Sequence, residues 1–130
     1  MNERMSPETN ALNWFEIPVT DISRAKKFYE SIFEIKMEDM EMSGMKYAMF
    51  PFSPMKGKVG GGLAQSPMHT PGTKGSIIYL NANPDLQKVL DRIENAGGKI
   101  TMPKTSIGQN GFMAFFTDSE GNRMALHSMK

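Results

Sequence analysis

Two ionisable side chains, Glu16 and His127, could act in catalysis or bind a metal ion, because of their chemical type and their predicted positions. Glu16 lies between Trp14 and Pro18, on the same face of a segment that alternates like a strand. A carboxylate in a cleft can act as a general base, and with a histidine it can form an acid–base pair. The two side chains could also supply two ligands of a divalent ion, which would need a third ligand from elsewhere. A structural ion pair of Glu16 with Arg123 or His127 is the alternative.

Neutral side chains near these two groups could bind an organic molecule. Tyr79 and Asn81 alternate on one predicted strand face and could hydrogen-bond a ligand or bridge a cleft. Trp14 offers a flat wall for an aromatic or apolar molecule, or could plug the cleft itself. The second histidine, His69, lies among prolines and glycines, where we expect it to be exposed to solvent. The candidate ligand-binding residues are Trp14, Glu16, Tyr79, Asn81, Arg123 and His127, with Glu16 as the catalytic candidate.

Several familiar kinds of site are absent from the sequence. The chain has no cysteine, which removes disulfides, thiolate nucleophiles and sulfur ligands for metals. The run 60–62 is three glycines without the Lys-Ser/Thr of a phosphate loop, so close approach of other groups to the backbone, or bending of the strand, explains it better. No Gly-x-Ser-x-Gly elbow of a serine hydrolase occurs.

Charge and hydropathy limit the kinds of partner that this chain can have. A net charge of +1 gives no electrostatic reason to expect nucleic acid or an anionic membrane as a partner. The sequence contains neither a leader-like segment nor an apolar run long enough to span a membrane. We therefore expect a cytoplasmic protein whose partner is a small molecule.

A repeated pattern of predicted elements positions these residues, and its first copy begins at residues 13–19, which alternate like a strand. Asp21 follows as a plausible N-cap of a helix. The apolar residues of this helix recur at helical spacing: Ala25, Phe28, Tyr29, Ile32 and Phe33. Further strands are predicted at 35–42 and 45–52, and 57–65 is predicted to be a strand or a loop that enters one.

The second copy repeats this order. A strand near 77–82 is followed by Asn83-Pro84, which is typical of a helix N-cap and first helical position. The helix has its own apolar stripe: Leu86, Val89, Leu90 and Ile93. Gly97-Gly98 ends it. Three strands then follow, near 99–102, 111–117 and 122–128.

The repeat predicts an α+β fold in which two βαβββ modules are related by a pseudo-two-fold axis. Module one covers about residues 12–66, module two about 75–129, and a linker 67–74 joins them. One face of each curved mixed sheet packs against the helix of its module. The residues expected on these faces are Phe15, Ile17, Val19, Ile78, Leu80 and Ala82, with Met124 and Leu126 as candidates on the last strand. The opposite faces, which carry the candidate ligand-binding residues, are expected to enclose a cleft.

Two segments resemble the vicinal oxygen chelate superfamily, which includes glyoxalase I, bleomycin-resistance proteins and extradiol dioxygenases. They are 14–29, with its strand, aspartate, Arg-Ala and Phe-Tyr, and 116–126, with Asp-x-x-Gly-Asn-x-x-x-Leu. The resemblance covers 12–128 and implies a single glyoxalase-like domain. Metal enzymes of this family hold a divalent ion with His, Gln or Glu at recurring strand positions. By the resemblance and the internal repeat, the residues at these positions are Trp14, Gly62, Ile77 and Ala125, none of which can donate a lone pair to a metal.

The resemblance thus implies a glyoxalase/bleomycin-resistance-like protein without the usual metal ligands and with no cofactor, which binds a small apolar or aromatic molecule in the cleft. The alternative is a lyase or isomerase, rather than a dioxygenase, with Glu16 as general base and a displaced divalent metal involving His127. A third reading is an interaction module whose own side chains fill the cleft. Family members often pair through sheet edges, so a homodimer is expected, which would shield the Met- and Phe-rich segments 45–52 and 111–117.

Overall fold

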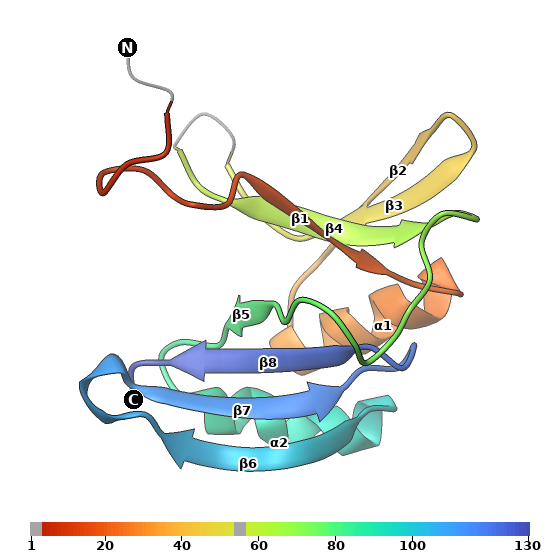
Figure 1. Cartoon of the computed structure of the whole chain (residues 1–130). Coiled ribbons are helices and arrows are strands. Elements are labelled where there is room, and N and C mark those ends of the chain that lie inside the picture. The colour runs from red at the N-terminus through yellow and green to blue at the C-terminus, as the bar shows by residue number, and fades with distance from the viewer. Residues whose placement is uncertain (1–3, 54–56) are drawn as a thin grey trace.

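Two four-stranded sheets, each with one helix, form the described part of the chain, residues 4–53 and 57–130 of a computed structural model (Figure 1). The elements of module one are β1 (Trp14–Pro18), α1 (Ile22–Phe33), β2 (Glu38–Met42), β3 (Met45–Met49) and β4 (Gly60–Gln65). Those of module two are β5 (Tyr79–Asn81), α2 (Leu86–Ala96), β6 (Lys99–Ser106), the short 3-10 helix η2 (Gly108–Asn110), β7 (Phe112–Thr117) and β8 (Arg123–Ser128). The strand orders are β1-β4-β3-β2 and β5-β8-β7-β6.

Both sheets are mixed in the same way. The first and last strands of each module pair in parallel, and the other neighbouring strands are antiparallel. The prediction of an α+β fold built from two βαβββ modules is therefore confirmed. None of the helices in the described residues is long and apolar enough to cross a membrane.

Aspartates begin both long helices. Asp21 caps α1, as predicted, and its side chain accepts a hydrogen bond from the backbone N–H of Arg24. The prediction that Asn83-Pro84 begins α2 is wrong. Asp85 is the N-cap, and the Asn83 Oδ1 instead accepts the backbone N–H of Met129 at 2.8 Å. The preferred cap chemistry occurs at both positions, and the tertiary contact of Asn83 decides between them.

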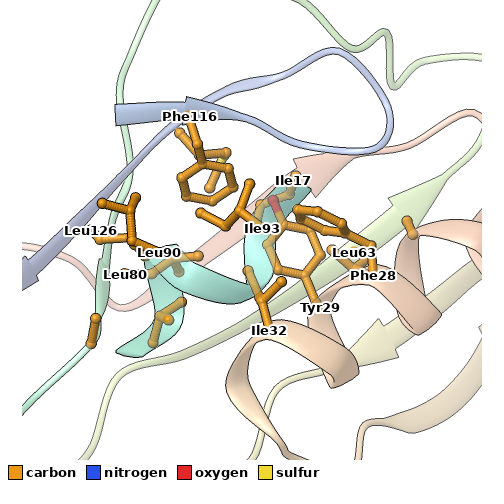
Figure 2. Close-up of a cluster of buried hydrophobic side chains, with 14 of the residues drawn as sticks. Ile17, Phe28, Tyr29, Ile32, Leu63, Leu80, Leu90, Ile93, Phe116 and Leu126 are labelled. Atoms are coloured by element: carbon orange, nitrogen blue, oxygen red, sulfur yellow. The ribbon is translucent and has the colours of Figure 1, made fainter. Parts of the chain in front are cut away.

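The apolar stripes of the two helices meet in one shared core (Figure 2). Most of the predicted helix-facing strand residues are buried there: Ile17, Val19, Leu80, Ala82, Met124 and Leu126. Phe15 and Ile78, which were predicted on the same faces, are only partly buried against this core. Helix α1 packs on β3, β4 and α2, and α2 packs on β6, β7 and β8. Phe28 of α1 contacts Phe116 of β7, with ring centroids 6.2 Å apart. The modules are thus joined through their helices by apolar packing, the main stabilising contribution to folding.

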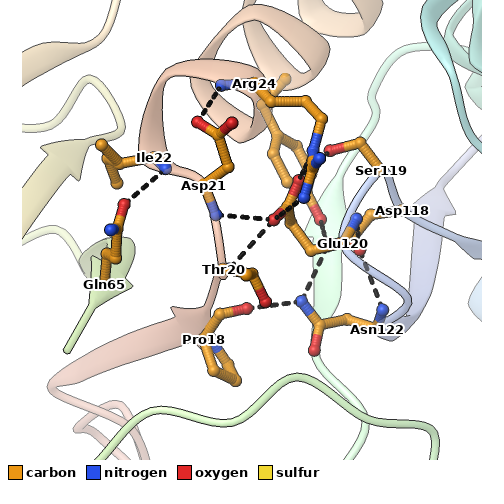
Figure 3. A network of polar contacts seen from close by, with 11 residues as sticks. Pro18, Thr20, Asp21, Ile22, Arg24, Gln65, Asp118, Ser119, Glu120 and Asn122 are labelled. Carbon is orange, nitrogen blue, oxygen red and sulfur yellow. Dashed lines mark hydrogen bonds and ion pairs between the residues drawn. The ribbon is translucent and has the colours of Figure 1, made fainter. Parts of the chain in front are cut away.

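A polar junction also ties module one to the turn between β7 and β8 (Figure 3). The hydroxyl of Tyr29, fully buried on α1, donates to Asp118 Oδ2 at 2.7 Å. The Asn122 amide donates to the carbonyl of Pro18 at 2.7 Å. Arg24 Nε donates to Glu120 Oε2 at 2.7 Å. The Asp-x-x-Gly-Asn segment therefore holds the two modules together, because buried or enclosed polar groups need partners.

Glu120 makes this junction sensitive to acid. Burial opposes its charge, but hydrogen bonds from Arg24, from Ser119 and from the backbone of Thr20 and Asp21 outweigh burial and lower its pKa from 4.5 to about 2. A depressed folded-state pKa contributes stability that is present above the unfolded-state pKa and is lost as the pH falls toward the folded-state pKa.

We expect the urea midpoint of the wild type to fall between about pH 5 and about pH 3 more steeply than that of Glu120→Gln, which has no such proton to bind. Urea titrations followed by circular dichroism at matched pH values measure both slopes. Parallel slopes for the two proteins would contradict this assignment.

Aromatic rings explain two glycines of the 60–62 run. A Cβ on Gly60 would overlap the Phe52 ring, and a Cβ on Gly61 would overlap the Phe15 ring. Successive residues of β4 face opposite sides of the sheet, so the rings cover the strand from both sides. The predicted close approach to the backbone is confirmed.

Gly61→Ala is expected to destabilise the protein by about 1–3 kcal/mol, because the methyl group forces the Phe15 ring out of a packed position. Gly72→Ala is the matched control, since a Cβ there has nothing within 4 Å. Its free energy of unfolding should stay within about 0.5 kcal/mol of the wild type. Equal stability of Gly61→Ala and Gly72→Ala in urea would contradict the packing.

Candidate functional site

A pocket of about 780 Å³ lies between β1 of module one and the segment that enters β5 of module two. Trp14, Ile77, Tyr79 and Asn81 line it. Its remaining walls are largely apolar and include Phe15, Phe33, Ile35, Phe50, Ile78 and Leu80. Three of the six predicted ligand-binding residues thus share one pocket, together with Ile77, one of the four positions that the resemblance assigns to metal ligands.

The aromatic and amide side chains in this pocket are held by neighbours. The Trp14 ring meets the Phe52 ring edge to face, with centroids 5.3 Å apart. Tyr79, which is 49% exposed, packs its ring against Phe115 at 6.1 Å. The Asn81 Oδ1 accepts the backbone and side-chain N–H groups of Asn83, so within the described residues its own NH₂ remains as a donor. The pocket therefore offers flat apolar surface and a few polar groups.

The other three predicted residues do not line this pocket. Glu16 Oε1 lies 2.7 Å from His69 Nε2, and His127 Nε2 lies 2.7 Å from the carbonyl oxygen of Asn110. A terminal N–H of Arg123 donates to the carbonyl of Gly75 at 3.1 Å. Neither predicted partner of Glu16 contacts it, and Glu16 and His127 do not form a pair. The reason is that the linker folds back over β1 and brings a different histidine to the carboxylate.

The four positions implied for a divalent ion do not come together around one pocket. Trp14 and Ile77 line the large pocket, whereas Gly62 and Ala125 are buried in the middle of β4 and β8. None of these side chains carries a donor atom for a hard or borderline cation. Within residues 4–53 and 57–130, no group of three or more His, Asp or Glu side chains is arranged to hold a metal. The residues present therefore do not fit the divalent ion that metal enzymes of the resembling family hold at these positions.

A second cluster, Ser66, His69 and Glu16, was not predicted from the sequence. His69 is not exposed as predicted, because its side chain is only 20% accessible and contacts Glu16. His69 Nδ1 also lies 2.7 Å from Ser66 Oγ. The signal that could have suggested the cluster is the segment Ser66-Pro67-Met68-His69, in which proline favours the second position of a turn and brings the first and fourth residues together.

Comparisons with known proteins identify the family to which this chain is similar. A family model described as Glyoxalase/Bleomycin resistance protein/Dioxygenase superfamily matches residues 11–126. Proteins named "Putative glyoxylase CFP32" from Mycobacterium bovis and Mycobacterium tuberculosis are 30% identical over 128 residues, which is 97% of this chain and 48% of theirs. The chain thus spans about half the length of these curated relatives.

Solved structures resemble this chain at lower sequence identity. A glyoxylase/bleomycin resistance protein/dioxygenase domain from Frankia sp. EAN1pec has a TM-score of 0.71 at 14% identity, covering 95% of this chain and 100% of its own. Glyoxalase I from Zea mays has a TM-score of 0.65 at 22% identity, covering 90% of this chain and 44% of its own. At these identities the similarity supports a common fold.

Proposed function

Since this chain belongs to the Glyoxalase/Bleomycin resistance protein/Dioxygenase superfamily, we propose that it binds a small apolar or aromatic molecule in the pocket lined by Trp14 and Tyr79. Binding does not use a metal at the usual family positions. The observation that carries this proposal is the pocket itself: its volume of about 780 Å³ lies within the range of roughly 300–1,000 Å³ for small-molecule sites.

The chemistry of the walls favours an apolar ligand. Phe15, Phe33 and Phe50 supply apolar surface, and the Trp14 ring supplies a flat face. Burial of apolar surface contributes roughly 25 cal/mol per Å², and a charged group in such a pocket would lose its hydration without gaining a partner. Asn81 and the Tyr79 hydroxyl can fix the orientation of one carbonyl or hydroxyl group on the ligand.

Fluorescence of Trp14 tests the proposal, because it is the one tryptophan in the sequence. The probe is 1-anilinonaphthalene-8-sulfonate, which accepts energy from a nearby tryptophan. Its aromatic rings match the apolar walls, and its sulfonate can stay in solvent beside the half-exposed Tyr79. We expect saturable energy transfer with a stoichiometry of one probe per chain. Probe emission that rises without quenching of Trp14 would place binding elsewhere and contradict the proposal.

A lyase or isomerase with Glu16 as general base is the second candidate. The favouring observation is the contact of 2.7 Å between Glu16 Oε1 and His69 Nε2, because a carboxylate beside an imidazole can exchange a proton with it. Glu16 does not line the large pocket, so it is not in place to act on a molecule bound beside Trp14. The binding function is therefore the better supported of the two.

We also propose a homodimer, but one that pairs through sheet faces. Strands β3 and β7 lie inside their sheets rather than at the edges, so edge pairing could not shield them. Asp39 of β2 pairs with Lys26 of α1 at 3.0 Å, so by alternation the Met40 and Met42 side chains lie on the other face of the strand. Met40 is 38% exposed and Met42 is 52% exposed. Exposed apolar side chains that adjoin one another mark association surfaces.

Light scattering after gel filtration should give the mass of a dimer for the wild type. Met40→Glu/Met42→Glu should shift the protein to monomer, because two charges would be buried without partners in the interface. Met68→Glu is the control, since Met68 is 88% exposed on the linker. A monomeric wild type would contradict this proposal.

A further inference from the structure

The geometry points to a second site, separate from the large pocket, in which Ser66 acts as a nucleophile toward small carboxylic esters with His69 as its base and Glu16 as a positioning residue. A pocket of about 450 Å³ is lined by Ser66 and His69. It shares no lining residue with the pocket beside Trp14. This site therefore does not depend on the proposed binding function.

Local structure brings the three side chains together. Ser66 follows β4, and the His69 N–H donates to the Ser66 carbonyl at 3.1 Å, which closes a turn with Pro67 at its second position. Glu16 is on β1, which pairs in parallel with β4 and places Glu16 opposite Gly62. The serine and the histidine thus come from one turn, and the carboxylate comes from the adjoining strand.

The Glu16 carboxylate sets the direction of these hydrogen bonds when the His69 imidazole is neutral. A carboxylate only accepts, so His69 Nε2–H donates to Glu16 Oε1 at 2.7 Å. In neutral imidazole the other nitrogen is then an acceptor. The Ser66 Oγ already accepts the backbone N–H of Met68 at 3.0 Å, and its own O–H donates to His69 Nδ1 at 2.7 Å. A hydroxyl that donates to a base, which a third group orients, is the arrangement of an activated nucleophile.

Groups that could stabilise a developing oxyanion line the same pocket. Gln65 Oε1 accepts the backbone N–H of Ile22 at 2.7 Å (Figure 3). This leaves the two N–H groups of its amide as donors. Lys46 also lines the pocket and brings a cation. Donors and charges placed where negative charge develops usually give the largest contribution to catalysis of acyl transfer.

The reaction balances with water as the co-reactant. The Ser66 Oγ attacks the carbonyl carbon of the ester while His69 Nδ1 takes the hydroxyl proton. The C–O bond to the alcohol breaks, and the departing oxygen takes that proton from Nδ1. Water then attacks the acyl-serine with its proton passing to Nδ1, the bond to Oγ breaks, and Oγ recovers the proton as the carboxylic acid leaves.

Hydrolysis of p-nitrophenyl acetate tests this site. We expect the wild type to release p-nitrophenol with turnover, and Ser66→Ala to lose about 100-fold or more of the rate. Ser31→Ala is the matched control, because Ser31 is exposed on α1. A fluorophosphonate probe should add covalently to wild type at Ser66, as located by peptide mass spectrometry, which keeps the test valid if Ser66→Ala fails to fold.

Glu16→Gln tests the positioning role. We expect kcat to fall about tenfold or more with KM unchanged. The urea midpoint should stay near that of the wild type. A residue with a merely structural role would not lower kcat while leaving KM and stability unchanged. Three results would each overturn the site. The folded wild type could hydrolyse p-nitrophenyl acetate no faster than buffer, Ser66→Ala could hydrolyse it as fast as the wild type, or the fluorophosphonate probe could attach to a different residue. An unchanged kcat in Glu16→Gln would overturn the role of the carboxylate.

Discussion

Asp118→Ala is expected to lower the free energy of unfolding by about 3–5 kcal/mol, because it leaves several buried polar groups without partners. Asp118 is 4% exposed. Its Oδ1 accepts the backbone N–H groups of Glu120 and Asn122, each at 2.9 Å. Its Oδ2 accepts the Tyr29 hydroxyl at 2.7 Å and the Asn122 amide at 3.0 Å. One carboxylate thus satisfies four donors, two of them on side chains that join the modules.

Urea unfolding followed by circular dichroism measures this effect, and Asp91→Ala on the exposed face of α2 is the matched control. Asp91→Ala should change the free energy of unfolding by no more than about 0.5 kcal/mol. A double-mutant cycle isolates the contact between modules. Tyr29→Phe should cost about 1 kcal/mol in the wild type and little or nothing in Asp118→Ala. Additive effects of the two substitutions would contradict the coupling.

Ile77→Glu should weaken binding of 1-anilinonaphthalene-8-sulfonate about 100-fold, because it places a charge among apolar walls and beside an anionic probe. Ile77 lines the pocket and is partly buried. Energy transfer from Trp14 reports the dissociation constant.

Ile77→Gln and Met68→Glu separate the causes of this loss. Ile77→Gln removes apolar surface without adding charge and should weaken binding about tenfold. Met68→Glu adds the same charge outside the lining of the pocket and should leave affinity unchanged. Equal affinities for Ile77→Glu and Met68→Glu would show that the probe does not bind in this pocket.

Sequence patterns predict most of the fold, because the spacing of apolar residues along the chain determines most of its helices and strands. The stripes at helical spacing, such as Leu86, Val89, Leu90 and Ile93, are buried as predicted. Ile17 of β1 and Met124 and Leu126 of β8 are also buried as predicted, since a period of two leaves little freedom once one face is apolar. Phe15, predicted on the same face as Ile17, is only partly buried and lines the large pocket. The predicted start of α2 at Asn83-Pro84 was wrong, because the side chains of Asn83 and Asp85 are both favourable at an N-cap. A contact with Met129, far along the chain, distinguishes them.

The candidate site was predictable only in part. Alternation on β5 places Tyr79 and Asn81 on one face, and the internal repeat associates Ile77 with Trp14. The partner of Glu16 could not be predicted, because it depends on the path of the linker. That path places His69 beside β1 and leaves His127 to bond to the Asn110 carbonyl. Strand periodicity contains no information about the direction of a loop.

A titration of the purified protein with 1-anilinonaphthalene-8-sulfonate in EDTA, detected by quenching of Trp14, tests the metal-free binding site most directly. We expect saturable binding at one probe per chain, with the same dissociation constant before and after addition of Zn²⁺, Ni²⁺ or Mn²⁺. Absence of saturable quenching, or quenching that requires one of these ions, would contradict a metal-free apolar site beside Trp14.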